Sequence, residues 1–192
     1  MRRPRRKPVL VATAVVAGVV LLVLALAFAE FLIPVGGRGD SMAPTMPAGN
    51  GRGIAEGFTY RFGGPHRGEI VVFHARGELG ADWTPDPSAS NSLEKRLIGL
   101  PGDTVVGRNG RVFVNGTKAD DIETPSFPAV HLGTGAYFVL GDNRTYSQDS
   151  RDFGPVPRDA IFARTVLVYW PLGRVGVPEY DKAQVPPGGP LC

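Results

Sequence analysis

Residues 105–114 read VVGRNGRVFV, a stretch in which two short apolar runs flank Asn109-Gly110. Asn-Gly accepts the left-handed backbone angles of a two-residue turn, and it is the strongest short-range signal for a β-hairpin. Asn115-Gly116 repeats this signal directly after the second run. This part of the chain therefore predicts a series of antiparallel strands.

Further strands are expected on both sides of this hairpin. Residues 93–100 (LEKRLIGL) lead into a turn at Pro101-Gly102-Asp103, and residues 69–74 (EIVVFH) contain an unbroken apolar run typical of a strand buried on both faces. Strands are also predicted at 137–140 and 160–170, with a weaker pattern at 54–60, whereas 76–91 and 119–135 read as irregular. With 26 Gly and 18 Pro in 192 residues, the fold class is mostly β, a small, coiled, antiparallel β-sheet domain.

A long apolar segment precedes this domain. Residues 9–29 would span roughly 30 Å as a helix, which matches the hydrocarbon core of a bilayer. The basic cluster before it predicts a cytoplasmic tip (1–8), a transmembrane helix acting as a signal anchor (9–29) and an extracytoplasmic domain (30–171). A tail follows (172–192), whose Pro and Gly content argues against packing. A cleaved signal peptide is the alternative, because Ala25 to Ala29 has the small-x-small pattern of a cleavage site.

The charge of the chain excludes one class of partner. The formal net charge is +3, but five basic residues lie at positions 2–7, which leaves 16 basic and 18 acidic residues in the remainder. The domain therefore has no general basic surface, and we expect no nucleic-acid partner. The one cysteine, Cys192, excludes an intrachain disulfide.

The first candidate for chemistry is Ser41, which lies between a Gly-rich approach and Pro44. Glycine permits unusual backbone angles, and Pro44 biases Ala43 away from helix, so the hydroxyl can be presented on a fixed turn, as a nucleophile needs. A surface turn without function is the competing interpretation.

An activated serine needs a base. Lys95 lies in the strand predicted at 93–100, and its side chain could point inward or outward with equal weight. Burial would lower its pKa towards the range useful for a general base. A Ser-His-Asp triad through His74 is the alternative. Ser92 and Lys95 also match the Ser-x-x-Lys of penicillin-binding enzymes, but the companion motifs of that class are absent from the sequence.

A third polar group follows the strand at 137–140, in residues 141–152. A solvated loop is the ordinary interpretation. The functional one is that Ser147 positions the Lys95 amine, while Asp149 and Arg151 form a charge network with Arg96 that fixes the strand carrying Lys95.

Together these segments resemble the bacterial type I signal peptidases, which are Ser–Lys membrane peptidases. Residues 41–46 (SMAPTM) are similar to the nucleophile box, and 67–73 (RGEIVVF) to the strand that follows it. Residues 95–103 (KRLIGLPGD) are similar to the box of the general base, 141–144 (GDNR) with 147–151 to the last box, and 169–171 (YWP) to the closing strand. The boxes keep the order of the family, and the resemblance to its Gram-positive members is the stronger.

The resemblance implies a coiled β-sheet domain of the signal peptidase type. It implies that Ser41 is the nucleophile, Lys95 the base and Ser147 the residue that orients Lys95, with Arg96, Asp142, Asp149 and Arg151 in support. Gly39, Met42, Pro44 and Met46 would shape the oxyanion hole, to which the Ser41 N–H contributes, and the substrate pockets. The implied activity is removal of signal peptides from exported preproteins after small-x-small sites, at a cell membrane, by a monomer without metal or cofactor.

Two residues depart from the family pattern. Gly39 stands where some members carry a serine that adds an oxyanion donor, and Glu94 stands where the residue before the base is usually apolar and lines the pocket. A specialised processing peptidase, a self-cleaving regulator that resembles the SOS repressors and an inactive signal-peptide-binding homologue are the alternatives. The apolar segment argues against the regulator, and retention of both Ser41 and Lys95 argues against the inactive homologue.

Overall fold

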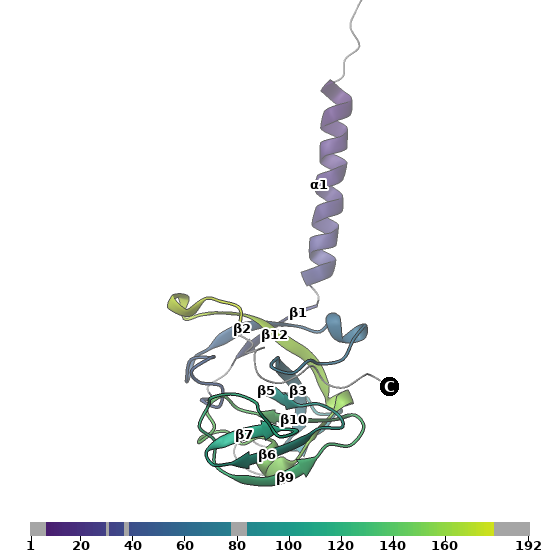
Figure 1. The fold of residues 1–192 in the computed structure, drawn as a ribbon. Helices are drawn as coiled ribbons and strands as arrows, with labels where there is room; N and C mark the ends of the chain where they lie inside the picture. Colours follow the sequence, from purple (N-terminus) through teal and green to yellow (C-terminus); the bar gives the residue numbers. More distant parts are fainter. Residues whose placement is uncertain (1–6, 30, 37–38, 78–83, 179–192) are drawn as a thin grey trace, which may run out of the picture.

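The structure, a computed structural model, describes residues 7–29, 31–36, 39–77 and 84–178; within the first helix it describes the side chains of residues 11–23. Figure 1 shows a β domain with one helix, α1 (Lys7–Ala29), standing apart from it. In the described part of the chain, no helix is long and apolar enough to cross a membrane, so the predicted span is not confirmed.

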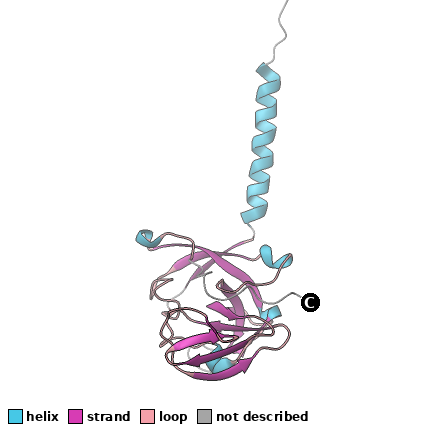
Figure 2. Ribbon diagram, viewed as in Figure 1, coloured by secondary structure: helices cyan, strands magenta, loops and turns pink. Residues whose placement is uncertain are grey.

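The β domain consists of two antiparallel sheets, which Figure 2 shows as almost all of its regular structure. The larger sheet has the order β1 (Leu32–Gly36), β2 (Arg52–Glu56), β12 (Ile161–Trp170), β3 (Ile70–Arg76), β5 (Asn91–Gly99), β10 (Ala136–Leu140) and β11 (Val156–Pro157), and β4 (Thr84–Pro85) pairs with β3. The smaller sheet has the order β8 (Thr117–Lys118), β7 (Arg111–Val114), β6 (Thr104–Arg108) and β9 (Phe127–His131).

Helical turns are short in this domain. They are η1 (Thr59–Arg61), α2 (Ser150–Phe153), η2 (Arg158–Ala160) and η3 (Leu172–Arg174). The expected antiparallel, mostly β class is therefore confirmed.

Two hairpins of the smaller sheet form where the Asn-Gly pairs predict them. Asn109 and Gly110 have φ angles of 51° and 72°, and Asn115 and Gly116 have 50° and 83°. These left-handed pairs join β6 to β7 and β7 to β8. The smaller sheet lies at the end of the domain far from α1 (Figure 1).

The cores follow the strand pattern. On β3, Val71 and Phe73 belong to one buried cluster, while Val72 faces another on the opposite side, so this strand is buried on both faces as predicted. A separate cluster, which includes Phe138 of β10 and Val105 of β6, joins the larger sheet to the smaller one. Apolar surface is buried on both sides of β3 and between the two sheets. This burial holds in place the strands that carry the polar side chains described below.

Three expectations about the chain path need correction. Residues 119–135 are not irregular throughout, because β9 pairs with β6; its Phe127 stacks on Phe138 with ring centroids 5.5 Å apart, and this long-range contact has no local signature. The weak strand at 54–60 lies earlier, at β2, and is followed by η1. The tail packs at Gly176, which pairs with Val168, although residues 179–192 lie outside the described part.

Candidate active site

Ser41 lies in a turn that the chain secures from two sides. Within the turn, the Ala43 N–H donates to the Asp40 carbonyl at 3.1 Å. From the segment after β10, the Asn143 N–H donates to the Ser41 carbonyl at 3.0 Å, and the Asn143 side chain donates to the Asp40 carbonyl at 3.2 Å. The turn at Ser41 is thus held by Asn143, which lies about a hundred positions away in sequence.

Lys95 points inward from β5 and meets this turn. Its Nζ lies 2.8 Å from Ser41 Oγ, and the residue is only 3% exposed. Among the described residues, Ser41 Oγ is the one hydrogen-bond partner of this amine. Of the two orientations that the sequence left open, the structure therefore has the buried one.

The protein lowers the pKa of Lys95 to about 8. Burial is the largest cause, because it penalises the charged ammonium form. The carboxylates of Asp149, Glu94 and Asp142 act in the opposite direction and limit the shift. A large fraction of this amine is consequently neutral in mildly alkaline solution, and a neutral amine can accept a proton from a hydroxyl.

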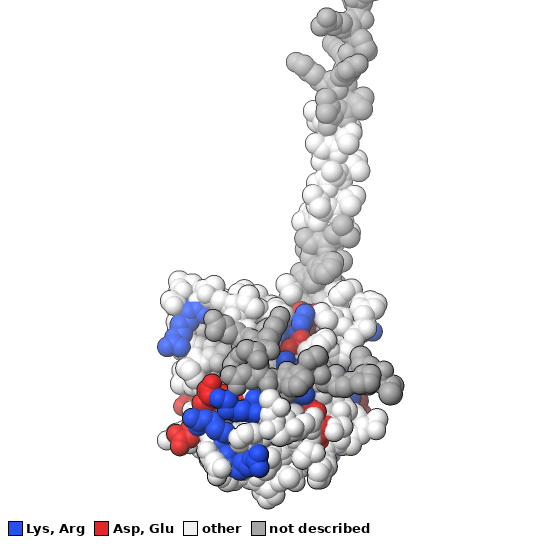
Figure 3. All heavy atoms as spheres, viewed as in Figure 1, with Lys and Arg blue, Asp and Glu red and all other residues white. Residues whose placement is uncertain are grey.

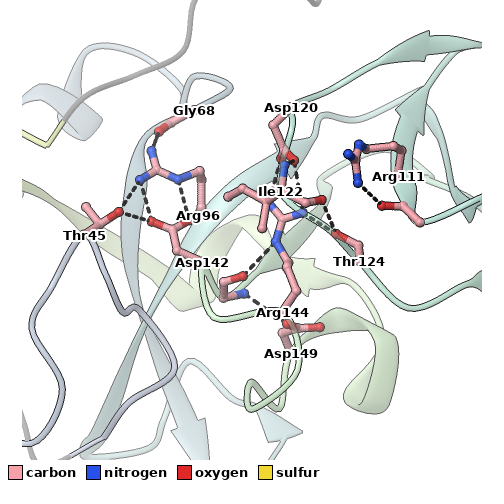
Figure 4. Close-up of polar contacts among 12 residues, drawn as sticks. Thr45, Gly68, Arg96, Arg111, Asp120, Ile122, Thr124, Asp142, Arg144 and Asp149 are labelled. Carbon is pink, nitrogen blue, oxygen red and sulfur yellow. Dashed lines mark hydrogen bonds and ion pairs between the residues drawn. The ribbon is translucent and has the colours of Figure 1, made fainter.

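Arg96, the next residue on β5, clamps several segments together. Its Nε and Nη2 each lie 2.7 Å from a carboxylate oxygen of Asp142, and its Nη1 donates to the Gly68 carbonyl at 2.7 Å (Figure 4). Thr45, from the nucleophile turn, donates to the same carboxylate at 2.5 Å. The clamp joins β5, the turn before β3, the segment after β10 and the Ser41 turn.

Asp149 and Arg151 form a second ion pair. Both guanidinium contacts to the carboxylate measure 2.8 Å, and the fully buried Asp149 also accepts the Gly141 N–H at 3.0 Å. The sequence predicted one network with Arg96. The structure instead divides the charges into the Arg96–Asp142 pair and the Asp149–Arg151 pair, because the helical turn α2 places Arg151 back over its own capping residue.

Ser147 is close to the site but is not joined to Lys95. It is 8% exposed, and its hydroxyl donates to the Gln148 carbonyl at a long 3.4 Å. A Cβ placed on Gly141 would collide with Ser147 Oγ and with the Ser41 carbonyl, so both residues press against this glycine. The expected hydrogen bond to the amine is not among the contacts that the structure contains.

The residues expected at the oxyanion hole and substrate pockets have different environments. Gly39 is exposed and would meet nothing within 4 Å if it carried a Cβ, and Pro44, whose preceding peptide bond is cis, is also exposed. Met42 and Met46 are 4% and 6% exposed and pack with Ile70 and Val168. The two methionines fill a small core beneath the turn instead of opening to solvent.

Glu94 occupies the opposite face of β5 from Lys95, as period-two alternation predicts. Its carboxylate accepts from the Thr165 hydroxyl at 3.2 Å and from the backbone N–H of Gly36, at the end of β1. Burial raises the pKa of this carboxyl. The departure from an apolar residue is accommodated by polar partners on β12 and β1.

Sequence reasoning missed one buried group beside the site. Arg144, 2% exposed, pairs with Asp120 at 2.6 Å and donates to Thr124 at 2.8 Å and to the Gly141 carbonyl at 2.8 Å (Figure 4). Arg144 lies in the polar segment 141–152, but its side-chain partners, Asp120 and Thr124, lie in the stretch 119–135 that the sequence predicts to be irregular.

The histidines are directed elsewhere. His74 stacks on Phe162 with ring centroids 4.2 Å apart, and His131 contacts Thr104 at 2.8 Å. The triad through His74 thus has no support, since Ser41 Oγ contacts Lys95. Across the described residues, no group of three or more His, Cys, Asp and Glu could hold a metal ion.

Comparisons with known proteins cover most of the chain. The family model described as "Signal peptidase, peptidase S26" matches residues 7–170. A signal peptidase I of Leptolyngbya laminosa is 40% identical over 142 residues, which cover 71% of this chain and 68% of that protein. Signal peptidase IB of Staphylococcus aureus is 33% identical over 158 residues, covering 70% and 76%.

A solved structure, a signal peptidase I from Enterococcus faecalis V583, superposes with a TM-score of 0.41 at 30% identity, over 52% of this chain and 94% of that one. The family match spans most of the chain, from the start of α1 to the end of β12. The chain belongs to the signal peptidase family, peptidase S26.

Proposed function

We propose that this protein removes the signal peptides of exported preproteins as a membrane-anchored serine endopeptidase, with Ser41 as nucleophile and Lys95 as general base. The observation that carries this proposal is the 2.8 Å contact between Ser41 Oγ and a lysine amine that is 3% exposed. A Ser–Lys pair is an established variant of the nucleophile-and-base arrangement. Membership of the signal peptidase family supports the substrate class.

The reaction follows from these two side chains. The neutral Lys95 amine takes the hydroxyl proton while Ser41 Oγ attacks the scissile carbonyl carbon. The Ser41 N–H, which has no acceptor among the described residues, donates to the resulting oxyanion. The Lys95 ammonium then protonates the departing amine as the C–N bond breaks. The Lys95 amine, neutral again, takes a proton from a water molecule, which attacks and hydrolyses the acyl ester.

Four side chains act as positioning residues in this proposal. Arg96 and Asp142 hold the Ser41 turn against β5, and Asp149 and Arg151 hold the backbone at Gly141 beside it. Ser147 contributes by packing against Gly141. Preorganised side chains of this kind keep the reacting atoms within a few tenths of an ångström of their working positions.

The nucleophile turn also bears on the cleavage specificity. We expect cuts after small-x-small sequences. Gly39 and Pro44 lie exposed on the turn, where they can contact the substrate backbone, and the buried Met42 and Met46 support the turn from below. Because these two side chains already fill the space under the turn, a large side chain next to the scissile bond has little room.

We also propose that the apolar segment of residues 9–29 crosses a membrane and that the catalytic domain lies outside it. The side chains of residues 11–23 are exposed, and their large apolar members touch nothing that would cover them. Apart from Tyr146, the exposed large apolar residues of the β domain lie in segments at the end nearest α1 in Figure 1: Leu32, Phe62, Trp170, Leu172, Val175 and Val177. Such a surface suits contact with a bilayer.

Cleavage of a model preprotein by the purified full chain tests the enzymatic proposal. Ser41→Ala and Lys95→Ala should each lower kcat by at least about a thousandfold, since removing either member disables the pair. Ser126→Ala and Lys118→Ala are matched controls at surface positions and should retain full activity. Activity that survives either of the first two substitutions would exclude the pair.

A further inference from the structure

A pocket of about 350 Å³ lies on the β domain away from Ser41 and Lys95. Its apolar walls include Phe31, Ile33, Ile161 and Phe162, which come from the segment after α1, from β1 and from β12. This volume lies in the range of small-molecule sites. None of the residues that line it belongs to the proposed catalytic machinery.

Two guanidinium groups lie among these apolar walls. Arg61 lies over the ring of Phe31, 4.9 Å from its centroid. Arg158 donates to the carbonyls of Ile161 and Tyr60, each at 3.0 Å, and lies 5.5 Å from the Tyr60 ring centroid. Within the described ranges, neither arginine forms an ion pair with a carboxylate, so both positive charges are available to an anion.

The position of the pocket restricts which anion can reach it. Phe31 follows the end of α1 by two residues, and η1, which contributes Arg61, lies at the end of the domain nearest α1 (Figure 1). The exposed Phe62 extends this apolar surface beyond the pocket, because its ring contacts Phe58, which in turn contacts Phe31. In Figure 3, acidic and basic side chains intermingle over the lower part of the face shown.

We propose that this pocket binds an anionic diacyl phospholipid, with the phosphate between Arg61 and Arg158 and the first part of an acyl chain against the apolar walls. Arginine suits phosphate because its planar fork can donate two parallel hydrogen bonds. The ligand class rests on the proposed placement of this end of the domain at a bilayer, but the site is independent of the peptidase chemistry. A bound lipid would fix the domain relative to the membrane surface.

Lipid binding to the full-length Ser41→Ala protein in neutral detergent tests the proposal. Short-chain phosphatidylglycerol is titrated and the melting temperature followed, with short-chain phosphatidylcholine and inorganic phosphate as parallel titrations. We expect phosphatidylglycerol to raise the melting temperature in a saturable manner. We expect Arg61→Gln to weaken its apparent affinity by about tenfold, because one charge-assisted contact is lost.

Arg52→Gln is the matched control, since Arg52 is exposed on β2 and does not line the pocket; it should leave the affinity unchanged. Arg158 donates to three backbone carbonyls, so deleting its side chain would also disturb the backbone around the pocket. Arg158→Lys, which keeps the charge, is therefore the variant to use at this position. Equal binding of phosphatidylcholine, equal binding of inorganic phosphate, or unchanged affinity in Arg61→Gln would overturn the proposal. Because the titrations measure binding and require no cleavage of a substrate, none of these outcomes depends on whether the enzymatic proposal holds.

Discussion

The pKa of Lys95 makes a direct prediction about the pH dependence of cleavage. Burial lowers this pKa to about 8, so the amine is mostly charged below that pH and mostly neutral above it. We expect kcat/KM to rise about tenfold per pH unit below pH 8 and to level off above it, since only the neutral amine accepts the Ser41 proton. A profile for the free enzyme with its acidic limb near pH 10, the range of an exposed lysine, would contradict the buried amine.

Glu94 should tune this profile from the other face of β5. Its carboxylate stabilises the charged form of Lys95 and thereby raises the pKa of that amine. Glu94→Gln keeps an acceptor for Thr165 and removes the charge, so we expect the acidic limb of the kcat/KM profile to move to lower pH by less than about one unit. Glu123→Gln, at an exposed position, is the control. A shift to higher pH in Glu94→Gln would show that the coupling has the opposite sign.

The segment after β10 packs tightly against the turn that carries Ser41. Gly141 has no room for a Cβ because Ser147 Oγ and the Ser41 carbonyl occupy that space. Gly141→Ala should therefore displace the Ser41 turn and lower kcat by about a hundredfold, the cost of misplacing a reacting atom by about 1 Å.

Gly133→Ala provides the comparison, since a Cβ there would meet nothing within 4 Å. Its kcat should equal that of the unmodified protein. Both variants should show the same far-ultraviolet circular dichroism, which separates a local displacement from loss of the fold. Full activity in Gly141→Ala would mean that the turn can move without consequence.

The Arg96–Asp142 ion pair joins β5 to the segment after β10, so breaking it should lower the free energy of unfolding. The side chains are 12% and 2% exposed, so Asp142→Asn leaves a largely buried guanidinium without its counter-charge. We expect a loss of about 3 kcal/mol in the free energy of unfolding, measured by urea denaturation. Asp121→Asn breaks the exposed pair with Lys118, whose side chains are 37% and 67% exposed, and should cause no measurable change.

Strands could be predicted from the sequence where neighbouring residues determine them, and could not where long-range contacts do. Asn109-Gly110 specifies its hairpin through its own backbone angles, and the apolar run of β3 specifies burial on both faces. By contrast, β9 forms because Phe127 reaches Phe138 and the strand pairs with β6, contacts that no local pattern contains. The resemblance selected Ser41 and Lys95, but spacing alone left the orientation of Lys95 open.

At the scale of the whole molecule, the candidate site is assembled from segments that are distant in sequence. The Ser41 turn, β5 and the segment after β10 meet only when the larger sheet is complete. The sequence alone therefore predicted one network of Asp149, Arg151 and Arg96. In the structure, Arg96 pairs with Asp142, and Arg151 pairs with Asp149. Charge complementarity within a cluster does not determine which partners the backbone brings together.

The orientation of the whole chain across a membrane yields the last prediction. Basic residues before an apolar helix favour a cytoplasmic N-terminus, which would place the C-terminus outside. The single cysteine, Cys192, is a natural reporter, because a membrane-impermeant maleimide applied to intact cells should label it without prior lysis. In the double variant Arg2→Cys, Cys192→Ser, labelling should require permeabilisation, since the reporter then lies at the cytoplasmic tip. The reverse pattern would place Ser41 and Lys95 on the cytoplasmic side, where exported preproteins have not yet crossed the membrane, and would overturn the proposed function together with the topology.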